Sequence, residues 1–383
     1  MRQRPRYEKQ IVTALARNPA CAILGPRQCG KTTLAQQIAS SRKVVHYFDL
    51  ERASSQAQLA HPETVLGVLS GLVVIDEIQR QPSLFAALRP LLDRRRSAAK
   101  FLLLGSASPD IVRGVSETLA GRIGFVDISG FDITEIPPAD WRKLWLRGGF
   151  PRSLLARNNN ASYEWRLDFV RTFLERDIPQ LGTRVSSEKL RRFWMMIAHY
   201  HAQIWNGAEI GRSLVANEHS VRSYLDLLSG AFVVRQLPPW FENISKRQFK
   251  ASKVYVRDSG ILHALLGLET FDQLSGHPKL GASWEGFALE QILSLTGARD
   301  AYFWGTHSGA ELDLLLLRKG KRFGVEFKCS DAPSMTKSLH IALQDLKLEH
   351  VWVVYPGNDI YPMHERVTAT PIAAVQTQLA KLL

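Results

Sequence analysis

The sequence has few cysteines, no long apolar run and no internal repeat. Its three cysteines, Cys21, Cys29 and Cys329, form neither a C-x-x-C pair nor an even set, so a reducing setting is favoured over a disulfide framework. No stretch reaches the roughly 18 apolar residues that a membrane-spanning helix needs. The basic start MRQRPRYEKQ is not followed by the apolar segment of a secretory signal. The sequence therefore predicts a cytoplasmic protein with no membrane partner.

Charge of one sign is in excess. The 383 residues include 49 Lys and Arg but 36 Asp and Glu, a net charge of +13. Such an excess favours polyanionic partners such as DNA, although a basic surface that only keeps the protein soluble is an alternative. The hydrophobic fraction of 45% is that of an ordinary globular protein. The length allows two or three domains, each with its own core.

A glycine-rich stretch, ILGPRQCGKTTLAQ, runs from Ile23 to Gln36. Its spacing, G-x-x-x-x-G-K-T, is that of a phosphate-binding loop, in which backbone N–H groups point at the phosphates. Lys31 would reach the β- and γ-phosphates, and the Thr32 hydroxyl would ligate Mg²⁺. The helix that follows offers its positive N-terminal end to the same anion. The candidate residues for binding ATP are Gly25, Pro26, Arg27, Gln28, Cys29, Gly30, Lys31, Thr32 and Thr33.

Two later apolar runs end in polar residues: GLVVIDE ends in Asp76 and Glu77, and FLLLGSAS carries Ser106. Beside a phosphate-binding loop, Asp76 is expected to support Mg²⁺ as a metal ligand. Glu77 is expected to polarise the attacking water, which favours ATP hydrolysis over binding alone. Ser106 is expected to sense the γ-phosphate or to orient water, although serine also forms ordinary turns at strand ends.

Short apolar runs alternate with helical patterns in the N-terminal third. The predicted strands are residues 21–24, 44–50, 71–77, 101–108 and 123–128. Strands that alternate with helices imply an α/β fold with a parallel sheet covered on both faces. The alternation breaks after residue 135, so the first domain is placed at residues 1–140.

The segments GPRQCGKTTLA, VVIDEIQ, LLLGSAS and SETLAGRI resemble AAA-type (AAA_14-like) ATPases fused to a C-terminal DUF4143 region. The resemblance extends through most of the chain. It implies a homo-oligomeric ring, such as a hexamer or heptamer, in which an arginine of one subunit enters its neighbour's site. Arg113 and Arg122 follow the predicted strand at residues 101–108, and Arg122 is the preferred candidate. An exposed, solvated role is the alternative for both.

Residues 141–260 are predicted to form a helical linker and a winged-helix domain. Val221, Tyr224, Leu225 and Leu228 follow the spacing of one buried helical stripe. A helix-turn-helix of this kind can place an exposed helix in a DNA groove. Residues 184–257 hold twelve Lys and Arg against five Asp and Glu, a net charge of +7, which suits phosphate contacts. Many winged helices mediate only protein contacts, and that alternative stays open.

Residues 261–383 carry acids between apolar runs. Strand alternation puts Glu326 and Lys328 on one face, and Leu312 and Leu314 opposite Asp313. An acid followed by E-x-K on the next strand is the pattern of PD-(D/E)XK nucleases, which the DUF4143 region resembles. The resemblance implies Mg²⁺ held by Asp313 and Glu326, with Glu290 as a possible further ligand, and Lys328 activating water. An inert remnant of a nuclease is the alternative.

The sequence thus favours an ATP-hydrolysing, DNA-associated ring protein. Two other functions stay open. One is a nucleotide-dependent switch that recruits another protein and carries an inert nuclease-like domain. The other is an active Mg²⁺-dependent DNA endonuclease coupled to the ATPase.

Overall fold

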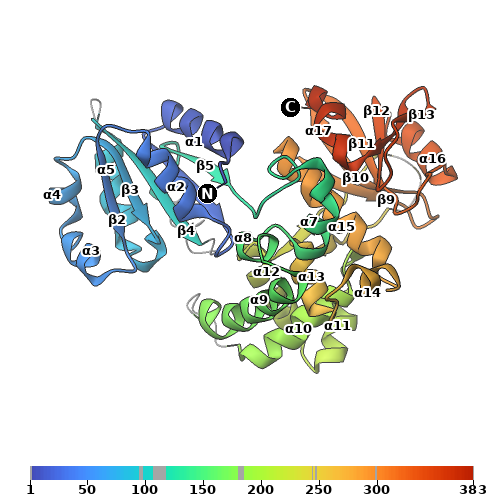
Figure 1. Ribbon diagram of the computed structural model, residues 1–383, viewed down its shortest axis with the longest axis horizontal. Helices are drawn as coiled ribbons and strands as arrows, with labels where there is room; N and C mark the ends of the chain where they lie inside the picture. The colour runs from blue at the N-terminus through green and yellow to red at the C-terminus, as the bar shows by residue number, and fades with distance from the viewer. Residues whose placement is uncertain are drawn as a thin grey trace. The chain divides into compact units, whose positions relative to one another are not determined.

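The apolar runs of the N-terminal third form a five-stranded parallel sheet (Figure 1). The strand order is β2-β3-β4-β1-β5. All six residues of β1 are buried, which requires cover on both faces of the sheet. The predicted α/β fold with a covered parallel sheet is therefore confirmed. The strands are β1 (Ala20–Gly25), β2 (Val45–Asp49), β3 (Gly71–Asp76), β4 (Ala99–Ser106) and β5 (Ile123–Asp127).

This computed structural model describes residues 2–94, 98–106, 118–179, 185–243, 245, 248–297 and 300–382. The chain divides into two compact units, Met1–Gly130 with Gly230–Phe232, and Phe131–Ser229 with Val233–Leu383. The helices of the first unit are α1 (Pro5–Arg17), α2 (Lys31–Ser40), α3 (Ala53–Gln58), α4 (Pro62–Leu66), η1 (Ile78–Arg80) and α5 (Ser83–Leu92). No helix within the described residues is long and apolar enough to cross a bilayer.

The second unit begins with a helical region and a small antiparallel sheet of order β6-β8-β7. Helix α12 buries the four residues of the predicted stripe, so that prediction is confirmed. The elements are η2 (Pro138–Asp140), α7 (Trp141–Arg147), α8 (Pro151–Leu154), α9 (Asn159–Thr172), η3 (Phe173–Asp177), α10 (Ser187–His199), β6 (Gln203–Ile204), α11 (Gly207–Leu214), α12 (Glu218–Gly230), β7 (Val234–Leu237) and β8 (Lys253–Val256).

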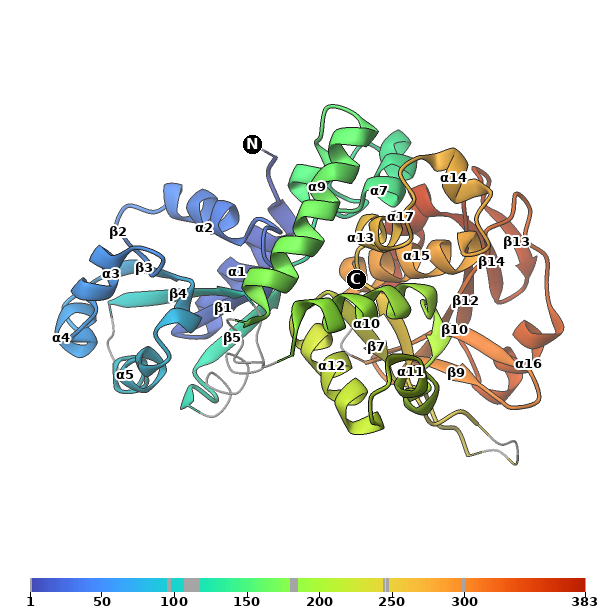
Figure 2. The same cartoon turned by 90° about the horizontal axis from the view of Figure 1, so that it is seen from below.

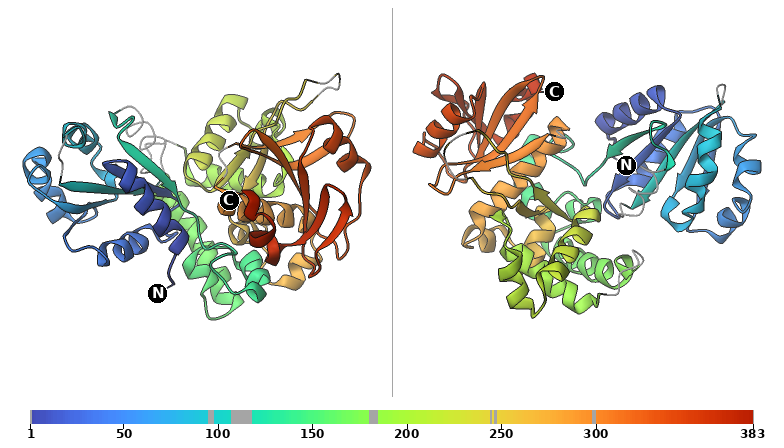
Figure 3. Two further views of the ribbon diagram at one scale, coloured as in Figure 1. Left: turned by 90° about the horizontal axis from the view of Figure 1, so that it is seen from above. Right: turned by 180° about the vertical axis from the view of Figure 1, so that it is seen from behind.

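The rest of the second unit contains a six-stranded mixed sheet of order β13-β14-β12-β11-β10-β9 (Figure 3). Strands β10 and β11 form the predicted hairpin. The elements are α13 (Ser259–Leu265), α14 (Phe271–Ser275), α15 (Leu280–Thr296), β9 (Ala301–Gly305), β10 (Glu311–Arg318), β11 (Lys321–Phe327), α16 (Lys337–Asp345), β12 (His350–Tyr355), β13 (Tyr361–His364), β14 (Val367–Pro371), η5 (Ile372–Ala374), α17 (Val375–Gln378) and η6 (Ala380–Leu382).

Helices α15 and α16 lie on opposite faces of the six-stranded sheet (Figures 1 and 2). On the α15 face, Trp284 and Phe287 pack with Val325 and Phe327 in a core that also takes in Tyr255 of β8. On the other face, α16 packs on a separate apolar cluster. The small sheet and the large sheet of this unit therefore share one core, which fixes β8 against the strands that carry the predicted acids.

Candidate nucleotide site and a buried acidic cluster

The loop between β1 and α2 favours glycine at two positions, one because of a close contact and one because of its backbone conformation. A side chain at Gly25 would bring its Cβ to 2.2 Å from the Ile128 carbonyl oxygen. Gly30, the residue before α2, has φ of +101°, a conformation that other residues rarely adopt. The two glycines of the motif thus let the chain turn tightly from strand to helix, as a phosphate-binding loop requires.

Lys31 points back over this loop. It is 5% exposed, and its Nζ donates to the carbonyl oxygens of Gly25 (3.0 Å) and Pro26 (2.8 Å). The first turn of α2 carries no acidic residue. An ammonium group therefore lies beside a helix N-terminus that has no negative charge of its own in that turn, which is the electrostatic requirement for binding phosphate.

Asp76, at the end of β3, meets the first turn of α2. The Thr32 hydroxyl donates to Asp76 Oδ2 at 2.8 Å, and the Tyr47 hydroxyl donates to the same oxygen at 2.7 Å. Burial, then the hydrogen bond to Asp76, raises the pKa of Tyr47, so Tyr47 stays a neutral donor. Tyr47 was not among the predicted site residues; its only signal is its place near the end of the strand that pairs with β3.

The hydroxyl of Thr32 and the carboxylate of Asp76 fit Mg²⁺. Both supply oxygen, and Mg²⁺ is commonly held by one or two protein ligands together with nucleotide phosphates and water. Asp76 is only 3% exposed, and a buried carboxylate needs compensating positive charge. The two predicted metal ligands of the first unit are thus brought together.

Glu77 directly follows Asp76 in an unusual backbone conformation. Its φ of +56° lies in the left-handed region, which is uncommon outside glycine and is often found at functional sites. Its N–H donates to Asp76 Oδ1 at 3.0 Å, and the Gln79 side chain donates to its carboxylate. Gln79 was not anticipated from the sequence. The contact with Asp76 holds the backbone of Glu77, and the contact with Gln79 orients its carboxylate.

Arg27 of the loop joins an ion-pair network at the same edge. Arg27 and Arg80 both donate to Glu51 Oε1, at 3.2 Å and 3.1 Å. Arg80 is a second arginine that sequence reasoning did not select, because it lies 53 residues from Arg27 along the chain. The pair places two guanidinium groups around one carboxylate next to the loop.

The remaining predicted residues of this unit lie at two different edges. The backbone of Ser106 pairs with Gly25; its side chain is outside what the structure describes, as is Arg113. Arg122 precedes β5, so it lies at the sheet edge opposite the loop. It pairs with Asp93 through Nε (2.5 Å) and Nη2 (3.0 Å). Arg122 is therefore not part of the site in its own subunit.

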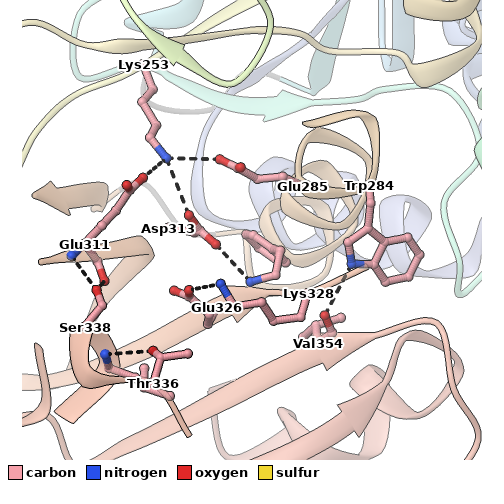
Figure 4. A network of polar contacts seen from close by, with 12 residues as sticks. Lys253, Trp284, Glu285, Glu311, Asp313, Glu326, Lys328, Thr336, Ser338 and Val354 are labelled. Carbon is pink, nitrogen blue, oxygen red and sulfur yellow. Dashed lines mark hydrogen bonds and ion pairs between the residues drawn. The ribbon is translucent and has the colours of Figure 1, made fainter. Parts of the chain in front are cut away.

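In the second unit, the structure brings Asp313, Glu326 and Lys328 together (Figure 4). Lys328 Nζ donates to Glu326 Oε1 at 2.6 Å, and Asp313 Oδ2 accepts from the Phe327 N–H at 3.0 Å. Glu326 is 6% exposed, and its Oε2 has no hydrogen-bond partner in the part of the chain that the structure describes. One buried carboxylate oxygen is thus left without a donor.

The expected alternation along β10 is wrong. Leu312 belongs to the α16-side cluster, whereas Leu314 belongs to the α15-side core, so the two do not share a face. The reason is an irregularity in the β9–β10 pairing between Leu312 and Leu315. A β-bulge of this kind adds a residue to one strand and redirects the side chains beside it, here Asp313.

The expectation that Glu290 joins Asp313 and Glu326 is also not met. Glu290 pairs with two arginines, Arg235 of β7 and Arg257 after β8. Burial acts to raise the pKa of Glu290, but the two guanidinium groups outweigh it and hold the pKa below its usual value. Glu290 therefore links α15 to the small sheet and the residue that follows it through two ion pairs.

The third acid of the cluster is Glu285, one residue after Trp284 on α15. Its Oε1 accepts from the Tyr255 hydroxyl at 2.7 Å and from Lys253 Nζ at 3.2 Å. Lys253 also contacts Glu311 and lies 3.4 Å from Asp313 Oδ1. Figure 4 shows its side chain reaching from β8 into the carboxylates. Neither Lys253 nor Glu311 was selected from the sequence.

The donor set of this cluster does not fit Mg²⁺ as it stands. A lysine ammonium lies between the carboxylates that would hold the ion. No group of three or more His, Cys, Asp or Glu side chains among the described residues is placed to hold a metal. The residues of this cluster therefore do not support a metal-dependent step.

Two acids of this cluster, Glu326 and Glu285, have pKa values well above those of ordinary glutamates. Burial and then the Asp313 carboxylate raise the pKa of Glu326 to about 8, against the opposing effect of Lys328. The same two causes raise the pKa of Glu285 to about 7. Buried like charges of this kind favour the neutral carboxyl form.

The raised pKa of Glu326 predicts a loss of stability at high pH. Between the unfolded value near 4.5 and the folded value of about 8, the folded chain holds a proton that the unfolded chain has released. The free energy of unfolding of the second unit should therefore fall as pH rises from about 5 to 9, by a few kcal/mol at most. Urea unfolding at about pH 5 and about pH 9 measures this free energy for wild type and for Glu326→Gln. Its decrease with pH should be smaller for Glu326→Gln than for wild type. An exposed control, Glu349→Gln, should keep the wild-type slope; equal slopes in all three would refute the assignment.

Comparison with known proteins gives a family for the whole chain. Two relatives, Uncharacterized protein Rv2008c of Mycobacterium tuberculosis and Uncharacterized protein Mb2031c of Mycobacterium bovis, are each 47% identical over 364 residues, covering 95% of this chain and 82% of theirs. An AAA domain (AAA_14) matches residues 17–137, and a domain of unknown function (DUF4143) matches residues 280–375. The chain belongs to the AAA_14–DUF4143 family. The resemblance to AAA_14-like ATPases with a C-terminal DUF4143 region is thus confirmed.

Two further matches concern the middle of the chain and the fold. Residues 138–272 match a second domain of unknown function (DUF8612). The Walker-type ATPase PABY2304 of Pyrococcus abyssi superposes with a TM-score of 0.51 at 14% identity, covering 70% of this chain and 96% of that chain. At that identity the likeness shows a shared fold.

Proposed function

We propose that this AAA_14–DUF4143 protein binds ATP with Mg²⁺ and hydrolyses it. The observation that carries the proposal is the meeting of Lys31, Thr32 and Asp76 at one edge of the parallel sheet, with Thr32 bonded to Asp76 at 2.8 Å. A strand, a glycine turn, a lysine and a helix N-terminus bind phosphate, and a second strand supplies the metal-supporting acid. The membership of an AAA family supports the same conclusion.

The residues divide the chemistry between them. The loop N–H groups and the Lys31 ammonium would bind the β- and γ-phosphates, with Lys31 exchanging its two carbonyl acceptors for phosphate oxygens. Thr32 and Asp76 would hold Mg²⁺, which neutralises phosphate charge when bound. Glu77 would accept a proton from the attacking water, and Ser106 would orient that water or sense the γ-phosphate. Phosphate release from ATP, measured with and without Mg²⁺, tests the proposal: turnover should require Mg²⁺.

We also propose that Arg122 acts between the subunits of a homo-oligomeric ring. The residue lies at the sheet edge opposite its own loop and is engaged by Asp93, so it would act only on a neighbouring subunit's phosphates. Homo-oligomers such as hexamers or heptamers bring such edges together. Arg122→Ala should then keep ATP affinity within about threefold and lower turnover by roughly a hundredfold or more. Turnover by Arg122→Ala equal to that of wild type would refute the role.

We further propose that the chain has three domains, residues 1–140, 141–260 and 261–383. The middle domain would consist of a helical linker and a winged helix, and it would contact DNA. The element order α10, β6, α11, α12, β7, β8 supports the winged helix. The +7 of residues 184–257 overstates its surface charge, because Arg235, Lys253 and Arg257 pair with acids outside that segment. Arg222 of α12 pairs with Asp226. Exposed basic residues that would contact phosphates include Arg191 and Arg192 on α10.

Salt dependence tests the DNA proposal. Removing one phosphate-binding side chain should lower the slope of log affinity against log salt by about 1. The Arg191→Ala, Arg192→Ala double variant should therefore bind a DNA duplex more weakly, with a slope smaller by about 2, in fluorescence anisotropy at several salt concentrations. Arg171→Ala, an exposed arginine on α9 paired with Glu175, is the control and should match wild type. Wild type that binds no duplex would favour a protein-recruiting switch.

For the C-terminal part, the helix α15, strands β9 to β11, helix α16 and strand β12 support a nuclease-like fold. The lysine between its carboxylates favours an inert domain over an active endonuclease.

A further inference from the structure

We propose that Lys253 is a built-in cation that takes the place of a metal ion in the acidic cluster of the second unit. While Lys253 is present, the cluster formed by Glu285, Glu311, Asp313 and Glu326 would bind no divalent cation. The inference goes beyond the proposed ATPase and does not depend on it.

The first argument is the position of the ammonium group. Lys253 Nζ contacts one oxygen from each of three carboxylates: Glu285 Oε1 at 3.2 Å, Asp313 Oδ1 at 3.4 Å, and Glu311 Oε1. These oxygens come from two elements, α15 and β10. An ammonium group has three N–H donors and no acceptor, so one lysine can serve all three acids, as a metal ion bound by oxygen would.

The second argument is that the lysine is fixed. Lys253 begins β8, the central strand of its sheet, and its backbone is paired with Leu237 on one side and Ile204 on the other. The residue is 4% exposed. Tyr255, two positions along the same strand and hence on the same face, donates to Glu285 as well. Strand β8 thus places two hydrogen-bond donors in the cluster, the Lys253 ammonium and the Tyr255 hydroxyl.

The third argument is charge and an unused oxygen. Four acidic side chains meet two ammonium groups in this cluster, those of Lys253 and Lys328, so removal of Lys253 leaves Lys328 as the only one of these two cations. Two of the four acids, Asp313 and Glu326, are buried, and a buried carboxylate without compensating charge is costly. Glu326 Oε2 is buried and has no hydrogen-bond partner within the described residues. A vacancy at Lys253 would therefore be lined by carboxylate oxygens, the ligands that Mg²⁺ and Mn²⁺ prefer.

Mn²⁺ titration of the full-length chain without nucleotide tests the inference, with free Mn²⁺ followed by electron paramagnetic resonance. All variants carry Thr32→Ala, so that the nucleotide site is not counted. Lys253→Met should gain one Mn²⁺ site, at least tenfold tighter than any site of the Thr32→Ala parent. Adding Asp313→Asn to Lys253→Met should remove that site. Lys321→Met, which removes an exposed lysine paired with Glu349, should gain none.

Two further measurements keep the inference open to refutation if Lys253→Met unfolds. Lys253→Gln keeps a donor without the charge and should gain the same site. In the parent with Lys253 intact, Asp313→Asn should leave Mn²⁺ binding unchanged. The inference is overturned if the parent already binds Mn²⁺ in a manner that Asp313→Asn abolishes, or if a folded Lys253 variant gains no site. Nicking of plasmid DNA by wild type with Mg²⁺, abolished by Lys328→Ala, would overturn it equally.

Discussion

A Glu77→Gln chain should bind ATP as wild type does and hydrolyse it at least about a hundredfold more slowly. An amide has nearly the shape of the carboxylate but cannot accept the proton of the attacking water, and general-base catalysis contributes roughly 10²- to 10⁴-fold. Phosphate release measures the rate, and the amount of ATP retained per chain measures binding. Because Glu77 lies beyond the loop that binds phosphate, the two quantities should separate.

The control for this variant is Glu63→Gln. Glu63 is an exposed acid in the first turn of α4, in the same unit, and its replacement should leave both binding and turnover unchanged. Wild-type turnover by Glu77→Gln would show that another group activates water, and the role given to Glu77 would then be wrong.

Lys31→Ala should lose most of its affinity for ATP. A hydrogen bond from a charged group contributes about 1.5–3 kcal/mol, so the dissociation constant should rise by roughly ten- to a hundredfold or more. The side chain is buried against the Gly25 and Pro26 carbonyls, so a circular dichroism spectrum must first show that the variant is folded. Anisotropy of a fluorescent ATP analogue measures the affinity.

Lys43→Ala is the matched control, because Lys43 is an exposed lysine of the same unit. It should bind the analogue like wild type. Equal affinity of Lys31→Ala and wild type would show that the loop does not bind the triphosphate, and turnover by this variant at the wild-type rate would exclude the assignment altogether.

The candidate nucleotide site could be predicted from the sequence because most of its residues are close together along the chain. The loop, its two glycines, Lys31 and Thr32 occupy eight consecutive residues, and Asp76 ends an apolar strand of ordinary length. In a parallel sheet, strand ends meet at one edge, so the pattern alone places Asp76 beside the loop. The pattern could not supply the side chains that support the site from β2 and η1. Tyr47 has no signal beyond its place near the end of β2, Gln79 has none, and the residue type of Glu77 does not indicate its positive φ.

Only part of the acidic cluster could be predicted, because Lys253 is far from the acids along the chain. Asp313, Glu326 and Lys328 sit on one hairpin, where strand spacing brings them together. Lys253 comes from a strand of another sheet, 60 residues before Asp313. Glu285 and Glu290 are five residues apart on one helix and therefore face different sides, and nothing local decides which of them meets Asp313.

The charge count of residues 184–257 overstates the surface charge for the same physical reason. The count treats Arg235, Lys253 and Arg257 as surface charge, yet the fold pairs each of them with an acid from α15. Pairing of this kind depends on which elements pack together, and net charge carries no information about packing.

The central claim is that the first unit captures ATP with Mg²⁺, and calorimetric titration of the intact chain tests it most directly. Wild type should show a heat of association for one nucleotide per chain, weaker when Mg²⁺ is withheld and weaker again in Lys31→Ala. A folded wild-type chain that gives no heat with ATP and Mg²⁺ would contradict the account.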